Sequence, residues 1–323
     1  MINDPVIKDD WHPVLRTDAL PDGRLIGARL MDEDIVLWRT EGRVQAWQDL
    51  CIHRGTRLSL GEVRSSRLKC PYHGWEYNTE GYCVHIPAHP EQTPPAKARV
   101  RTYLAGEKYG LIWVSLGNPQ KDIPSFPEEP DPGYRKVLAG PFGPVKASAP
   151  RIIENFLDVA HFPFVHAGSL GDESRPEIAD YTVETGPDGV AANDIQIYQP
   201  DPYGTGVGDV VHYQYRVFRP FTAYLAKQTK LTRFSILFPI TPVDEKTSVA
   251  WFYMALDRGY DLPDDEITRF HSSILAQDVP IVESQRPELL PLDLQAELHL
   301  RSDRTSISYR RWLSEIGLTF GTA

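Results

Sequence analysis

The stretches Cys51-Ile52-His53 and Cys70-Pro71-Tyr72-His73 each supply one thiol and one imidazole, and sixteen residues separate them. Two sulfur and two nitrogen ligands, delivered as one mixed pair from each of two loops, match a 2Fe–2S cluster in which two Cys hold one iron and two His hold the other. Such a cluster carries electrons. We therefore assign Cys51, His53, Cys70 and His73 as cluster ligands.

A zinc ion is the main alternative, because zinc also binds two Cys and two His. Zinc sites usually pair Cys with Cys and His with His, whereas each loop here is mixed. Gly55 and Gly74 follow the two histidines and allow close approach of the backbone, and Pro71 stiffens the second loop. These features favour a Rieske-type cluster. Cys83, the remaining cysteine, is expected to be a small core residue.

The composition narrows the classes of partner. The 323 residues have 41% hydrophobic content and carry a net charge of −10. The negative net charge argues against nucleic acid and anionic membranes as partners. Three cysteines leave no disulfide framework, and no segment is long and apolar enough for a signal sequence or a membrane span. We expect a cytoplasmic protein.

Sequence patterns divide the chain into two domains joined by a connector. Residues 1–117 contain short apolar bursts broken by turns, typical of a small all-β domain with the ligand loops at hairpin tips. Residues 118–134 carry five prolines and are expected to form an extended connector. Residues 135–323 combine alternating strands with helical stretches near 151–166, 264–284 and 302–316, which predicts an antiparallel sheet with packed helices. The predicted fold class is α+β.

A second metal site is predicted within Glu154-Asn-Phe-Leu-Asp-Val-Ala-His-Phe-Pro-Phe-Val-His166. His161 and His166 would lie about 140° apart on an unbroken helix, but Pro163 breaks or bends it, so both imidazoles could converge. Two imidazoles and one carboxylate form the ligand set of non-haem Fe(II) oxygenases. We assign Asp278 as the carboxylate and Asp158 as a hydrogen-bond partner of His161. Spacing alone leaves open that the histidines are ordinary core or surface residues.

Together these motifs resemble a family. The C-x-H-x16-C-x2-H pattern, the run N-F-L-D-x-x-H-x4-H from Asn155, and Q-D-x4-E-S-Q from Gln277 are similar to the oxygenase (alpha) component of Rieske non-haem iron oxygenases. The length and the final helix resemble the small alpha-only branch, which includes vanillate- and dicamba-type O-demethylases, N-demethylases and hydroxylases of saxitoxin-type alkaloids.

The resemblance implies a Rieske domain followed by a helix-grip catalytic domain, assembled as a head-to-tail homotrimer. The cluster of one subunit would serve the mononuclear Fe(II) of its neighbour through Asp158, with Asn155 near the iron. The implied activity is monooxygenation, with O2, of a small aromatic or alkaloid-like molecule, by hydroxylation or by O- or N-demethylation. The alternatives are ring cis-dihydroxylation and, in another class, an electron-transfer or docking protein without oxygenase chemistry.

Electrons must come from a partner, because no flavin or nicotinamide site is apparent. We expect a ferredoxin or a flavin reductase, with NAD(P)H acting only through it. Five basic residues follow the first ligand loop, and we call them the basic collar: Arg54, Arg57, Arg64, Arg67 and Lys69. The collar is the predicted docking surface for the electron donor. It could equally be a set of solvent-exposed charges without a partner. Ile195, Phe234 and Tyr253 are candidates for the substrate pocket. The histidines outside the two metal motifs, His271 among them, receive no functional role.

Overall fold

The structure is a computed structural model that describes residues 4–202, 206–259 and 261–323. It divides the chain into two compact units, residues 1–123 and 124–323, each of which is described by itself. The division falls inside the proline-rich stretch 118–134. No helix among the described residues combines the length and the apolar character needed to cross a bilayer.

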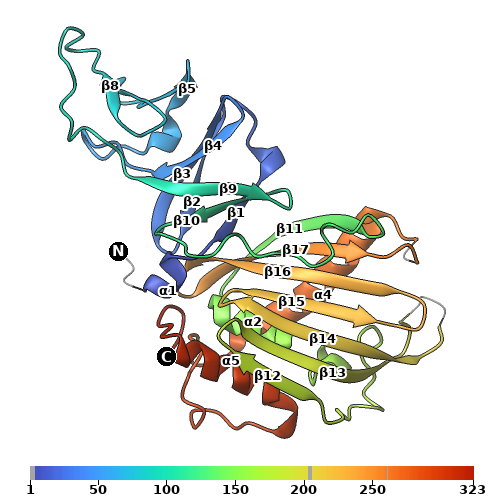
Figure 1. Ribbon diagram of the computed structural model, residues 1–323. Helices are drawn as coiled ribbons and strands as arrows, with labels where there is room; N and C mark the ends of the chain where they lie inside the picture. Colours follow the sequence, from blue (N-terminus) through green and yellow to red (C-terminus); the bar gives the residue numbers. More distant parts are fainter. Residues whose placement is uncertain (1–3, 203–205, 260) are drawn as a thin grey trace. The chain divides into compact units, whose positions relative to one another are not determined.

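The first unit contains two antiparallel sheets (Figure 1). In order of hydrogen bonding, the larger sheet consists of β1 (His12–Arg16), β10 (Leu111–Ser115), β9 (Thr102–Lys108), β4 (Arg43–Gln48), β3 (Glu33–Thr40) and β2 (Leu25–Leu30). The smaller sheet consists of β5 (Glu62–Arg64), β6 (Arg67–Lys69), β7 (Glu76–Tyr77) and β8 (Cys83–His85). Short helical turns complete the unit: α1 (Pro5–Lys8), η1 (Thr17–Ala19) and η2 (Leu58–Leu60).

Only one of the two predicted hairpin tips is a hairpin. The Cys70 loop connects β6 to β7, which pair antiparallel. The Cys51 loop instead leaves β4, passes through η2 and enters β5 in the other sheet, so the prediction was wrong for this loop. All three cysteines lie in one buried cluster of side chains with Trp47 and Tyr77, which also confirms that Cys83 is a core residue.

The second unit is a seven-stranded antiparallel sheet with helices packed on it (Figure 1). In order, its strands are β11 (Arg135–Val145), β17 (Thr247–Leu256), β16 (Arg233–Asp244), β15 (Thr222–Gln228), β14 (Asp209–Arg219), β13 (Gly189–Gln199) and β12 (Thr182–Gly186). The helices are α2 (Ala149–Leu157), α3 (Phe162–Val165), α4 (Asp264–Ser284), η3 (Arg301–Asp303) and α5 (Arg304–Glu315). Helix α2 contacts α4, α5 and strand β16. The α+β prediction is therefore confirmed.

The helix predicted over 151–166 is interrupted before Pro163. Helix α2 ends at Leu157, Asp158 takes an extended conformation, and a new turn, α3, begins after His161. Proline fits the first turn of a helix, where its missing N–H would have no partner. Pro163 therefore lies in the first turn of α3 and does not break α2. Pro280 lies inside α4, which nevertheless continues to Ser284.

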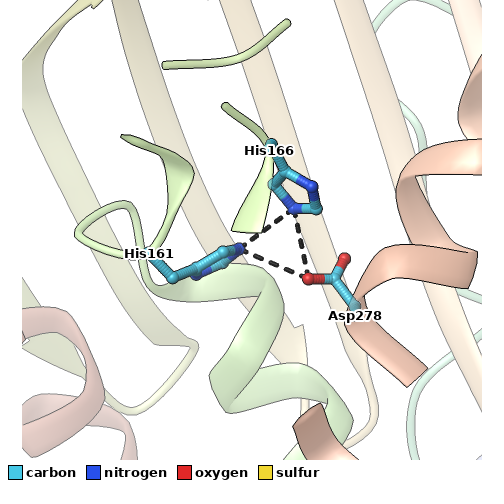
Figure 2. Close-up of side chains that lie close together, drawn as sticks. All are labelled: His161, His166 and Asp278. Atoms are coloured by element: carbon cyan, nitrogen blue, oxygen red, sulfur yellow. Dashed lines mark hydrogen bonds and ion pairs between the residues drawn. The ribbon is translucent and has the colours of Figure 1, made fainter. Parts of the chain in front are cut away.

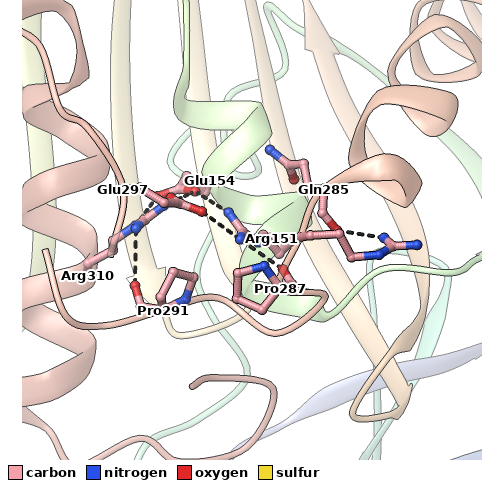
Figure 3. Close-up of polar contacts among 8 residues, drawn as sticks. Arg151, Glu154, Gln285, Pro287, Pro291, Glu297 and Arg310 are labelled. Carbon is pink, nitrogen blue, oxygen red and sulfur yellow. Dashed lines mark hydrogen bonds and ion pairs between the residues drawn. The ribbon is translucent and has the colours of Figure 1, made fainter. Parts of the chain in front are cut away.

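A buried group of charges fixes the position of α2 (Figure 3). Arg310 of α5 forms a two-pronged contact with Glu154 of α2, its Nη2 donating to Oε2 at 2.8 Å, and it also pairs with Glu297. Arg151 of α2 donates to Glu297 at 2.8 Å and to the Pro287 carbonyl at 2.9 Å. Two guanidinium groups and two carboxylates thus pair with one another inside the second unit. These pairs hold α2 in place, and the residues after the end of α2 belong to the candidate active site.

Candidate active site: a histidine and carboxylate triad on an aromatic cavity

Three side chains of the second unit converge on one point (Figure 2). The Nε2 atoms of His161 and His166 lie 3.2 Å apart, and Asp278 Oδ1 lies 3.4 Å from the first and 3.1 Å from the second. Among the described residues, this is the set of three ligand groups that could hold one metal ion. The structure thus brings together the three predicted ligands.

The geometry fits one octahedral ion. Three ligand atoms about 2.1 Å from an ion, at right angles to one another, would be about 3.0 Å apart, close to the observed separations. Asp278 Oδ1 is buried and accepts no hydrogen bond within the described chain, and an oxygen in that position is suited to bind a cation. Two imidazoles and one carboxylate on a single face match the donor set of a non-haem Fe(II) site.

Hydrogen bonds to the outer nitrogens orient both imidazoles. His161 Nδ1 donates to Asp158 Oδ2 at 3.2 Å, and His166 Nδ1 donates to Gln277 Oε1 at 2.7 Å. With hydrogen on Nδ1, each ring presents its Nε2 lone pair to the centre. The other oxygen of Asp158 accepts from the Ala160 backbone N–H at 2.7 Å. The sequence analysis predicted Asp158 as the hydrogen-bond partner of His161. It missed Gln277 as the partner of His166, although Gln277 is next to Asp278 in the chain.

The electrostatics of the site favour a cation. Burial lowers the pKa of His161, but the neighbouring carboxylates of Asp158 and Asp278 outweigh burial and raise this pKa to about 9. Burial raises the pKa of Asp278, but the nearby rings of His161 and His166 lower it by more, so that the pKa lies below its ordinary value. A divalent ion would take the place of the protons that these carboxylates attract.

The triad lies on the wall of a cavity of about 810 Å³, a size suited to a small organic ligand. Its lining includes a stack of aromatic rings: Phe156 stacks on Phe238 with centroids 4.3 Å apart, and Phe238 stacks on Phe252 at 4.8 Å. Asn155, in the last turn of α2, also lines it. The cavity can hold a flat aromatic molecule beside the metal site.

Of the three predicted pocket residues, only Phe234 lines the cavity. Tyr253 follows Phe252, and adjacent residues in a strand face opposite sides of the sheet; its hydroxyl donates to Glu129 at 2.8 Å. Ile195 is buried opposite Tyr213 in the sheet but is not part of the cavity wall. Those two predictions were wrong. Sequence reasoning also missed Lys227 and His271, both of which line the cavity.

In the first unit, the Cys51 and Cys70 loops share one backbone design. The carbonyl of each cysteine accepts from a glycine four residues later, Gly55 at 2.9 Å and Gly74 at 3.1 Å, and both glycines have positive φ. The two loops bring the rings of His53 and His73 to 4.4 Å between centroids, and His53 Nδ1 is buried without a hydrogen-bond partner within the described chain. Burial raises the pKa of the Cys70 thiol. Hydrogen bonds from the backbone N–H groups of Tyr72 and His73, in the same loop, partly offset this effect.

The four predicted cluster ligands do not fit a single ion. In a tetrahedral zinc site the four ligand atoms would lie about 3.3–3.8 Å apart, yet no three of these groups lie within 4.8 Å of one another in the described structure. In a 2Fe–2S cluster of this type the two Cys bind one iron and the two His bind the other, and the structure places the rings of His53 and His73 beside each other. Tyr77 adds a hydrogen bond of 3.1 Å to Cys51 Sγ.

The basic collar is largely neutralised by nearby acids. Arg57 pairs with Asp34, Arg64 and Lys69 pair with Glu62, and Arg67 pairs with Glu76. Asp34 and Glu76 lie outside residues 54–69, so the sequence of that stretch does not show them. Within the described chain, Arg54 alone of the five collar residues has no ion pair.

Comparisons with known proteins find matches to both units. Residues 10–104 match the Rieske [2Fe-2S] domain, and residues 145–318 match the vanillate O-demethylase oxygenase C-terminal domain. The chain is 32% identical to methylxanthine N1-demethylase NdmA of Pseudomonas putida, covering 98% of this chain and 91% of the relative. It is 39% identical to the probable methylxanthine N7-demethylase NdmC of Pseudomonas sp. (strain TJI-51), covering 66% of this chain and 77% of the relative.

The solved structure of Pseudomonas putida CBB5 NdmA with caffeine is similar over 96% of this chain and 91% of that chain, with a TM-score of 0.85 and 31% identity. The match therefore spans both units, and the family models cover the candidate cluster ligands and the candidate iron ligands. The chain belongs to the Rieske non-haem iron oxygenases whose catalytic domain is of the vanillate O-demethylase type, and it is a Rieske monooxygenase of small organic molecules.

Proposed function

We propose that this enzyme removes a methyl group from a nitrogen or oxygen atom of a flat aromatic or heteroaromatic molecule. One observation carries the proposal: the three ligand atoms of His161, His166 and Asp278 converge on the wall of a cavity whose lining includes several stacked aromatic rings. Relatives named as methylxanthine N-demethylases span nearly the whole chain and support the reaction class.

The reaction balances as a monooxygenation. A substrate X–CH3, with O2, two electrons and two protons, gives X–CH2OH and water. The carbon–X bond then breaks, the carbon leaves as formaldehyde, and X takes the hydroxyl proton. Hydroxylation of a C–H bond consumes the same reactants and ends at the alcohol.

The proposed cofactors are a 2Fe–2S cluster held by Cys51, His53, Cys70 and His73, and an Fe(II) ion held by the triad; together they would supply electrons and activate O2. The chain itself orients and shields the substrate. The stacked rings of Phe156, Phe238 and Phe252 offer a flat apolar wall that excludes water. Asp158 and Gln277 hold the Nδ1 hydrogens of the two histidines.

The proposed assembly is a head-to-tail homotrimer in which the cluster of one subunit serves the iron of the next. Asp158 supports this arrangement, because its side chain is 34% exposed although it is bonded to His161. It could therefore contact a cluster histidine of a neighbouring subunit. Electrons would come from a reductase or ferredoxin, and the unpaired Arg54 is the strongest point of the basic collar for docking an acidic donor.

A product screen tests the proposal. Chemically reduced, iron-loaded enzyme would meet O2 and a panel of methoxy-aromatic and N-methyl heteroaromatic compounds in a single turnover, with formaldehyde and products measured by mass. We expect formaldehyde in proportion to demethylated product. Gain of two oxygens on a ring would identify cis-dihydroxylation, and cluster reoxidation without product from any compound would contradict demethylation. His161→Ala, which keeps the cluster ligands, is the matched control and should give no product.

A further inference from the structure

One face of helix α4 forms a wall of the cavity. The side chains on this face are Ile267, Phe270, His271, Ile274, Leu275 and Asp278, and their spacing of three and four residues is that of a single helical stripe. Asp278 belongs to the triad, and His271 is the other polar side chain of the six. Seven residues, or about 10 Å along the helix axis, separate these two. A flat ligand whose methyl group lies at the triad could therefore meet His271 with its opposite edge.

Contacts within the second unit fix the orientation of the His271 ring. Its Nδ1 donates to the Ile267 carbonyl at 2.9 Å. A carbonyl can only accept, so the hydrogen is on Nδ1 and the lone pair is on Nε2. The ring packs against Phe234, Phe252 and Phe270, with centroids 5.2, 5.8 and 5.3 Å away. Rotation of the imidazole would break these contacts, and Nε2 is therefore held as a fixed acceptor.

No donor from the described part of the chain meets His271 Nε2. The side chain is partly accessible, so a ligand in the cavity can reach it. Burial, with Lys227 contributing, lowers the pKa of His271 to about 4, and the ring is neutral near pH 7. Its Nε2 thus stays an acceptor under ordinary conditions. An acceptor among aromatic rings is favourable only when water or a ligand bonds to it.

The charges around the cavity do not select an ionic ligand. Lys227 lines it, and so do the carboxylates of Asp201, Asp261 and Asp278. Because both signs are present, an anion would meet three carboxylates and a cation would meet the ammonium group. An uncharged N–H or O–H group can bond to the neutral imidazole without the larger cost of desolvating an ion. The partner that fits His271 Nε2 is a neutral donor.

We propose that His271 is a specificity-determining residue, and that its Nε2 accepts a hydrogen bond from an uncharged ring N–H or phenolic O–H of the substrate. This bond would turn the opposite edge of the ring, which carries the methyl group, toward the triad. The inference rests on the proposed function and adds a hydrogen-bond donor to the substrate. Fully N-methylated molecules such as caffeine lack this donor and should be poorer substrates.

The test compares compounds that differ in the donor alone. 4-Methoxyphenol and 4-methoxyfluorobenzene differ by one O–H, and theobromine and caffeine differ by one ring N–H that a methyl group replaces. We expect the donor compound of at least one pair to have a KM about tenfold below that of its partner, the factor expected for one neutral hydrogen bond. The pair that shows the preference identifies the donor as an O–H or an N–H group.

Three variants assign the preference to His271. His271→Phe keeps a flat ring but removes the acceptor, so it should raise KM for the donor compound about tenfold and leave its kcat and the other compound little changed. His271→Gln, which keeps an acceptor oxygen, should restore part of the preference. His212→Phe, at an exposed position outside the cavity, is the matched control. Equal use of both members of each pair, or a preference that survives in His271→Phe, would overturn the inference.

Calorimetry without O2 separates this inference from the proposed function, because it measures binding of the same compounds without turnover. If no compound releases formaldehyde, tighter binding of a donor compound that is lost in His271→Phe and retained in His271→Gln would support the role of His271 while demethylation fails. Binding that does not depend on the donor or on His271, or no binding of any donor compound, would contradict the inference. The absorption spectrum of the cluster and circular dichroism show whether each variant is folded.

Discussion

Both imidazoles of the candidate iron site are held by one hydrogen bond each. Because Gln277 Oε1 accepts from His166 Nδ1 at 2.7 Å, it determines which nitrogen of His166 carries hydrogen. Loss of such a partner typically lowers metal affinity by about 10- to 100-fold.

We expect Gln277→Leu to lose the mononuclear iron on dialysis against a chelator, while Gln277→Glu, which keeps the acceptor oxygen, retains it. Iron per chain is the measurement, and an unchanged cluster spectrum shows that the first unit is intact. Equal iron retention in Gln277→Leu and the wild type would contradict the role assigned to Gln277.

His271 makes the stability of the folded chain depend on pH. Its pKa is lowered to about 4 in the folded state, whereas an unfolded histidine titrates near 6.5. As the pH falls from about 6.5 to 4, the unfolded chain binds a proton that the folded chain does not. The free energy of unfolding should therefore fall, by on the order of 3 kcal/mol from this residue.

Urea unfolding between pH 4.5 and 7 measures this loss. His271→Asn should flatten the pH dependence, whereas His89→Asn, at an exposed position, should leave it as in the wild type. A pH dependence that is the same in His271→Asn and wild type would show that His271 does not contribute.

At the scale of elements, helix α2 connects the buried charge group to the iron site. Its side chains Arg151 and Glu154 join Arg310 and Glu297, and the residues just after its end carry Asp158 and His161. The positions of the metal ligands therefore depend on buried ion pairs between residues that are not themselves metal ligands.

Glu154→Gln would leave the buried Arg310 guanidinium short of one counter-charge. We expect a loss of about 3–5 kcal/mol in the free energy of unfolding, together with weaker retention of the mononuclear iron. Glu315→Gln, at an exposed position at the end of α5, is the control. A loss no larger than that of the control would show that the buried group does not stabilise the unit.

Elements were predicted more securely than the contacts between them. The bounds of α4 agree with the helical pattern predicted at 264–284, because helical periodicity is a local feature of the sequence. The break between α2 and α3 was misplaced because a proline can either break a helix or begin one. Tyr253 was assigned to the pocket wrongly, since alternation separates two faces of a strand without showing which face lines a cavity.

The metal ligands were predictable for a different reason. Two histidines and a carboxylate are the residue types that a non-haem iron site needs, although the spacing of the histidines alone left an ordinary core or surface role open. All three triad atoms do meet in the structure. Lys227 was not predictable, because a single lysine in a strand resembles an ordinary solvent-exposed one. Only the register with Tyr213 and Phe234 places it in the cavity.

At the scale of the whole molecule, the proposed trimer makes each reaction depend on two subunits. A mixture of His73→Ala subunits, which lack the cluster, and His161→Ala subunits, which lack the iron, should regain activity when assembled together. With random assembly, an intact cluster faces an intact iron at about a quarter of the interfaces, so about a quarter of wild-type activity per chain is expected. Each variant alone should be inactive, and an inactive mixture that still forms trimers would contradict transfer between subunits.

The central claim is that one chain holds two distinct iron centres, one in each unit. Iron and acid-labile sulfide analysis of the wild type and Asp278→Ala tests it most directly. We predict about three irons and two sulfides per chain in the wild type, and about two irons with the same sulfide and cluster spectrum in Asp278→Ala. A wild-type chain with zinc and no sulfide, or an Asp278→Ala chain with undiminished iron, would contradict the account.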